Sequence, residues 1–158
     1  MRQLILLRHA HAEPAPSGGS DLDRPLSAEG LAEAESAGRW LKDQGLAPDR
    51  VLCSPARRTR ETLEAVFATT GYVDKRLEEA IYDATPGALA SLVDQHRDVD
   101  RLLVVGHNPG LERLVALLGT GQSGDYRGMP PAAIAVLRLP DDAAVEPGIA
   151  ELTAFWWP

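Results

Sequence analysis

Two runs of consecutive apolar residues stand out along the chain, Leu4–Leu7 and Leu102–Val105. Runs of this kind are typical of strands buried on both faces, as in a parallel sheet covered by helices. Both runs end abruptly in polar residues. Arg8 and His9 follow the first run, and His107 closely follows the second. Ligands of open α/β sheets bind beyond the carboxyl ends of the strands, so chemistry is expected at these residues.

Capping residues and proline mark where the helices are expected to begin. Apolar residues then recur at helical spacing, and Gly119 is expected to end the last helix. The predicted starts are Ser27, Ser54 with Pro55, the stretch Asp83–Pro86, and Asn108 with Pro109. Further strands are expected at Val51–Cys53, at Ala132–Leu139 as an edge or late strand, and at Ile149–Trp157.

This alternation of strands and helices predicts an α/β fold. The architecture expected is a three-layer α/β/α sandwich with a mostly parallel central sheet. A length of 158 residues with 44% hydrophobic residues suits one domain covering residues 1–158. The stretch Glu13–Asp21 is rich in proline, glycine and serine, and it is long enough to form a rim or lid.

Composition narrows the classes of partner. The net charge of -7 argues against nucleic acid or an anionic membrane as the main partner. A single cysteine, Cys53, excludes an internal disulfide and suits a reducing compartment. No run is long enough to span a membrane, and no signal-peptide pattern precedes the first strand. We therefore expect a soluble cytoplasmic protein, monomeric by default.

Histidines and arginines at separate strand ends suit phosphoryl transfer. Guanidinium groups stabilise the charge that spreads over the phosphoryl oxygens, and a neutral imidazole can attack phosphorus and hold it covalently. Neighbouring arginines disfavour the imidazolium and so keep a nucleophilic histidine unprotonated. In an acidic protein, the arginines gathered near these strand ends point to one anion site. They are Arg8, Arg57, Arg58 and Arg60.

Four segments also carry a family resemblance, in the family's own order from Leu4 to about Val136. They resemble motifs of the histidine phosphatase superfamily, also called the phosphoglycerate mutase-like family. Its Arg-His-Gly signature is similar to Arg8-His9-Ala10, with alanine replacing glycine. The other matches are Pro25–Gly30 at a helix start, Ser54–Thr62 with the spacing Ser-Pro-x-x-Arg-x-x-x-Thr, and Val104–Pro109 around the second histidine. The short chain most resembles the compact SixA-type phosphohistidine phosphatases.

The resemblance implies a role for each motif residue. His9 would be the nucleophile that forms a phosphohistidine intermediate, and Arg8, Arg58 and His107 would bind the phosphate. Arg58 rather than Arg57 falls four residues after Ser54, as the motif requires. The acidic residue of the mutase segment corresponds to Glu79, which would donate a proton to the leaving group.

The function expected is therefore metal-independent, cofactor-free phosphohydrolysis, with phosphohistidine on a protein as the favoured substrate. Two alternatives stay open. One is a phosphomonoesterase acting on a small phosphorylated metabolite, and the other is a phosphoprotein-binding module without turnover. A substrate panel and a test for a phosphoenzyme separate these three.

Other residues invite competing interpretations. His11 forms a His-x-His pair with His9, but no carboxylate-rich set accompanies it, so a rim position is expected rather than a metal site. Cys53 lacks the spacing to arginine that Cys-based phosphatases need, and a small core residue is expected. His96, beside Arg97 and Asp98, is expected to be exposed to solvent.

Overall fold

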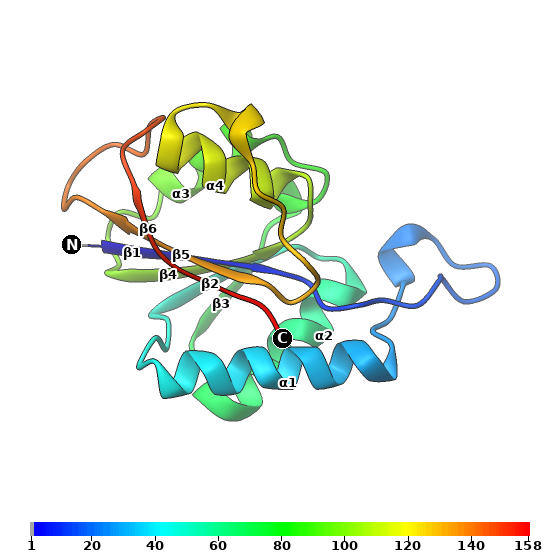
Figure 1. Cartoon of the computed structure of the whole chain (residues 1–158). Coiled ribbons are helices and arrows are strands. Elements are labelled where there is room, and N and C mark those ends of the chain that lie inside the picture. Colours follow the sequence, from blue (N-terminus) through cyan, green and yellow to red (C-terminus); the bar gives the residue numbers. More distant parts are fainter. Residues whose placement is uncertain (1) are drawn as a thin grey trace.

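Six strands form one sheet at the centre of the protein, with helices on both faces (Figure 1). The computed structural model describes residues 2–158. The strands are β1 (Arg2–Arg8), β2 (Arg50–Cys53), β3 (Asp74–Leu77), β4 (Arg101–Gly106), β5 (Ile134–Leu139) and β6 (Glu151–Trp156). The helices are α1 (Ala28–Asp43), α2 (Arg57–Thr70), α3 (Pro86–Asp94) and α4 (Gly110–Thr120). The α/β/α prediction is confirmed.

The strand order is β3-β2-β4-β1-β5-β6. Strands β1 to β4 pair in parallel, whereas β5 pairs antiparallel with both β1 and β6. The mostly parallel sheet expected from the sequence is thus observed, and β6 rather than β5 forms the edge. At the other edge, β3 was not predicted, because its four residues are all exposed and carry no apolar pattern.

Strand β1 lies inside the sheet, and its side chains alternate between the two layers of helices. Leu4 and Leu6 belong to the apolar core under α3 and α4, whereas Ile5 and Leu7 belong to the core over α1 and α2. All four are at most 1% exposed. Burial of each such side chain stabilises the fold by about 1.5–3 kcal/mol, so the end of β1 is firmly held. Within residues 2–158, no helix has the length and apolar character needed to cross a membrane.

Two helix starts are displaced from their predicted positions. Helix α2 begins at Arg57 with Ala56 as its N-cap residue, not at Ser54, whose hydroxyl contacts His107 and accepts from the N–H of Ala56. Helix α4 begins after Pro109, although the Asn108 side chain still accepts a hydrogen bond from the N–H of Glu112. Its end is also displaced, since the left-handed glycine that stops it is Gly121 rather than Gly119. Ser27 caps α1 as predicted, and α3 begins within the predicted stretch Asp83–Pro86, with Thr85 as its cap.

The segment 13–25 leaves the body of the protein beyond the carboxyl end of β1 and returns to α1 (Figure 1). Its two ends are joined by a backbone bridge between Ala12 and Leu26 and by a hydrogen bond of 2.8 Å from the N–H of Glu13 to the carbonyl of Pro25. A single helical turn, η1 (Asp21–Asp23), interrupts it. We call residues 13–25 the β1–α1 loop.

Candidate active site

Three parallel strands bring their carboxyl ends together at one edge of the sheet. Arg8 at the end of β1 is in register with Gly106 of β4, and Cys53 of β2 is in register with Val105. A cavity of about 320 Å³ opens at this edge. Its lining residues are Arg8, His9, His11, Ala12, Arg24, Arg58, His107, Asn108 and Pro131. The structure therefore brings together four of the predicted site residues, from three separate segments of the chain.

His9 is held by its main chain on both sides. Its N–H donates to the carbonyl of Gly106 at 3.1 Å, and its carbonyl accepts from the N–H of Ala132 at 3.2 Å. The ring Nδ1 lies 2.7 Å from the carbonyl of Ala10. A carbonyl only accepts, so Nδ1 carries the proton in this hydrogen bond and Nε2 keeps a free lone pair. Nε2 is therefore the ring nitrogen of His9 with a lone pair free for attack.

The charge state of His9 favours nucleophilic attack. Burial lowers its pKa from 6.5 to about 4, and the positive charges of Arg58 and Arg8 act in the same direction, against the bond to Ala10. The imidazole is therefore neutral at neutral pH. This agrees with the expectation that neighbouring arginines keep the nucleophile unprotonated, although burial is the larger cause.

His107 faces His9 across the cavity, with 5.3 Å between the two ring centroids. Its Nε2 lies 2.7 Å from the hydroxyl of Ser54. Its Nδ1 is buried and has no partner among the described residues. Burial lowers the pKa of His107 to about 3, with His9 and Arg58 adding to the effect. His107 is therefore a neutral imidazole in the wall of the cavity.

The two predicted phosphate-binding arginines are fixed in different ways. The guanidinium of Arg8 donates to the carbonyl of Met129 at 2.8 Å. The Arg58 side chain is 7% exposed, and its NH1 and NH2 groups donate to Asp21 of the β1–α1 loop. Thr62 joins α2 to the end of β1, because its hydroxyl donates to the carbonyl of Arg58 at 2.7 Å and accepts from the N–H of Ala10 at 3.1 Å. The Nε atoms of both arginines are buried without a partner among residues 2–158.

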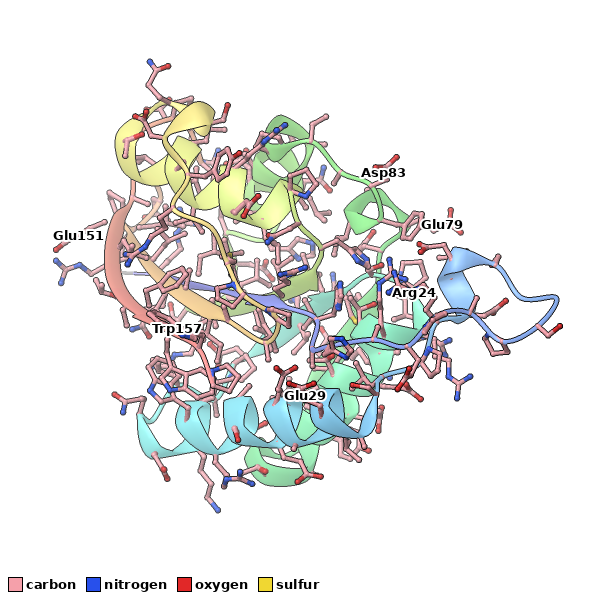
Figure 2. All side chains as sticks on the ribbon, turned by 45° about the vertical axis from the view of Figure 1, so that its right-hand side comes forward. Arg24, Glu29, Glu79, Asp83, Glu151 and Trp157 are labelled. Carbon is pink, nitrogen blue, oxygen red and sulfur yellow. The ribbon has the colours of Figure 1, made fainter. Side chains whose placement is uncertain are left out.

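Glu79 is not brought to this cavity. It lies in a short helical turn after β3, η2 (Glu79–Ile81), and its side chain is exposed. It is absent from the residues that line the cavity, and Figure 2 shows it at the outer surface. Its assignment as proton donor stays a prediction from the resemblance.

The competing interpretations are tested by the same geometry. His11 is exposed on the rim, and its Nδ1 lies 2.7 Å from the Ser27 hydroxyl. No group of three or more metal-binding side chains occurs among residues 2–158. Cys53 is fully buried, and burial raises its pKa to about 12, as suits a core residue. The prediction for His96 is wrong: it is 7% exposed, because Arg50 covers it, with a guanidinium nitrogen 3.1 Å from Nδ1.

Residues 4–90 match the family model of the histidine phosphatase superfamily, branch 1. The chain belongs to this superfamily. The matched stretch contains Arg8, His9, Arg58 and Glu79, whereas His107 lies beyond it. A protein of Mycobacterium tuberculosis with no described function is 40% identical over 159 residues, which cover 94% of this chain and 98% of that protein.

Two further similarities indicate the branch of the superfamily. The phosphohistidine phosphatase SixA of Escherichia coli is 32% identical over 127 residues, 77% of this chain and 76% of that enzyme. The crystal structure of the putative phosphohistidine phosphatase SixA from Agrobacterium tumefaciens has a TM-score of 0.85 and 31% identity, covering 99% of this chain and 98% of that one. The predicted membership of the SixA-type branch is confirmed, and it supports a phosphatase activity.

Several residues of this histidine phosphatase were missed by sequence reasoning. Arg24 lines the cavity although it precedes Pro25 in a loop. Asp21 and Tyr82 meet each other beside Arg58, although they are 61 positions apart. Spacing and strand-end rules give no signal for such contacts, because they depend on the path of the β1–α1 loop. Ser54 did carry a signal, as the first residue of the Ser-Pro motif.

Proposed function

We propose that this protein removes a phosphoryl group from phosphohistidine on a protein, through a covalent phosphohistidine at His9. The observation that carries the proposal is the state of His9: a neutral imidazole with a free Nε2, facing a cavity lined by Arg8, Arg58 and His107. Neutral imidazole is the form that attacks phosphorus. Similarity to the SixA of Escherichia coli supports the choice of substrate.

The reaction has two displacements at phosphorus. In the first, the Nε2 lone pair of His9 forms the P–N bond while the bond from phosphorus to the leaving group breaks. In the second, water attacks the phosphoryl group, and the electron pair of the P–Nε2 bond returns to His9. Arg8 and Arg58 donate to the phosphoryl oxygens throughout, and so stabilise the charge that they carry in both transition states. His107 adds a hydrogen bond to the same oxygens.

This chemistry is carried by side chains of the protein alone, so we propose that it needs no metal. Activity in excess chelator should equal activity without it. A loss of activity on chelation, restored by a divalent ion, would contradict the metal-independent mechanism and favour the histidines His9, His11 and His107 as ligands.

The test of function combines trapping with a substrate panel. Brief incubation with an aryl phosphate, followed by denaturation, should yield a phosphoenzyme that is acid-labile and base-stable. His9→Ala should abolish it, whereas His11→Ala, at the exposed rim, should retain it. Phosphate binding without any turnover of phosphoester or phosphoramidate would instead indicate a binding module.

The panel decides between substrates. We expect kcat/KM for a phosphohistidine protein to exceed that for sugar phosphates and nucleotides. The reverse order would identify a phosphomonoesterase acting on a small metabolite, with the same intermediate at His9.

A further inference from the structure

The β1–α1 loop places a carboxylate directly on a phosphate-binding arginine. One guanidinium nitrogen of Arg58 donates to Oδ2 of Asp21 at 3.0 Å, and the other donates to the main-chain carbonyl of Asp21 at 2.8 Å. In the free protein, Asp21 therefore occupies the guanidinium of Arg58 that would bind the phosphoryl group of a substrate. Asp21 lies in a turn that is closed by a hydrogen bond of 3.0 Å from the N–H of Ser20 to the carboxylate of Asp23.

Asp21 contacts other residues around the cavity besides Arg58. Its Oδ1 lies 3.5 Å from a guanidinium nitrogen of Arg24, which lines the cavity and is labelled in Figure 2. The hydroxyl of Tyr82 donates to its Oδ2, and the Tyr82 ring meets the ring of His107 edge-on at 5.4 Å between centroids. The Asp21 carboxylate also raises the pKa of His107, against the larger effect of burial. The carboxylate is thus linked to two residues of the cavity wall and, through Tyr82, to a third.

We propose that Asp21, rather than Glu79, donates the proton to the leaving group in the first displacement and accepts a proton from water in the second. This inference rests on the proposed function, since it requires phosphoryl transfer to His9. Position argues for Asp21. Asp21 is exposed and outside the cavity lining, as Glu79 is, but its carboxylate contacts Arg58 and Arg24, which both line the cavity.

Substrate binding supplies the change of protonation that this role needs. In the free protein the hydrogen bond from Tyr82 and the charge of Arg58 lower the pKa of Asp21 to about 2, so the carboxylate is ionised. A bound phosphoryl group takes the guanidinium of Arg58 and brings its own negative charge to the carboxylate. Loss of a cation and gain of an anion both raise a carboxyl pKa. A bound phosphoryl group therefore shifts Asp21 towards its protonated form, against the hydrogen bond from Tyr82, which is retained.

The proton can enter with the substrate, because a phosphate monoester with a second pKa of about 6 is partly monoanionic near neutral pH. In the first displacement the leaving atom keeps the electron pair of its bond to phosphorus and takes the proton of Asp21. In the second, the Asp21 carboxylate takes a proton from the attacking water as the hydroxyl joins phosphorus and the P–Nε2 bond breaks. That proton leaves with the product phosphate, and Asp21 returns to Arg58.

Leaving groups of different basicity test this role. A 4-nitrophenolate departs without a proton, whereas phenolate departs poorly unless it is protonated. For Asp21→Asn, kcat/KM with phenyl phosphate should fall by ~10²–10³-fold, in the range of general acid catalysis, and with 4-nitrophenyl phosphate by less than ~10-fold. Inhibition by inorganic phosphate should be retained or strengthened, because Arg58 keeps its charge and loses its anionic partner.

Asp23→Asn is the matched control, since it alters the same turn without touching Arg58. It should lower kcat/KM for both esters by the same factor. Equal losses for both esters in Asp21→Asn would overturn the proposal, as would a leaving-group dependence found in Glu79→Gln and not in Asp21→Asn. Neither outcome would contradict the proposed function. That function is contradicted only if the wild-type protein forms no phosphoenzyme at His9.

Discussion

The neutral state of His9 is expected to make stability depend on pH. In the folded protein its pKa is about 4, chiefly because of burial, against an ordinary value of 6.5 in the unfolded chain. Between these values the unfolded chain takes up a proton and the folded protein does not, so the free energy of unfolding falls as the pH falls. The free energy of unfolding falls by about 1.4 kcal/mol per pH unit below pH 6.5, where the unfolded histidine is protonated. The total fall between pH 7 and pH 5 is therefore about 2 kcal/mol.

Replacing His9 removes this contribution and leaves those of groups that do not interact with His9 unchanged. Urea unfolding of wild type and His9→Asn at pH 7, 6 and 5 gives the free energy of unfolding of each by linear extrapolation. The wild-type value minus the variant value should decrease by about 2 kcal/mol from pH 7 to pH 5. A second variant, His9→Gln, should give the same trend with a different offset. A difference that stays constant over this range would refute the assignment of a buried neutral imidazole.

Other consequences follow from neighbouring contacts. The acid limb of kcat/KM should have a pKa of about 4, that of His9, and a limb near 6.5 in a pH–rate profile would contradict it. Gly30→Ala should destabilise the protein by ~2 kcal/mol or more in urea unfolding, because the added Cβ would lie 2.0 Å from the carbonyl oxygen of His11. Gly87→Ala is the control, because a Cβ at Gly87 meets no atom within 4 Å. Thr62→Val should cost about 1–3 kcal/mol by leaving a buried main-chain N–H unpaired, whereas Thr62→Ser should retain most of that stability.

Hydrophobic pattern predicted the parts of the fold that are buried. Strands β1 and β4 were evident because their side chains are covered on both faces, and the cap of α1 was correct to the residue. Strand β3 was missed for the converse reason: Asp74–Leu77 is an exposed edge, held by main-chain pairing that leaves no mark in the pattern.

The sequence predicted those residues of the site that directly follow a buried strand. Arg8, His9 and His107 follow two buried strands, and parallel pairing brings such ends together regardless of side-chain detail. The contact of Asp21 with Arg58 has a different origin, because it depends on how the β1–α1 loop folds back over α2. Loop paths follow from many weak local preferences, and the sequence carries no periodic signal for them.

The bridge between Ala12 and Leu26 makes the β1–α1 loop an exchangeable unit. Its ends meet by main-chain hydrogen bonds, so residues can be inserted or removed between them without moving β1 or α1. In the mechanism proposed above, the nucleophile can stay constant while the residue that donates the proton to the leaving group changes with one short segment. Grafting loops of other lengths onto this scaffold is therefore a direct route to altering which phosphorylated molecules it accepts.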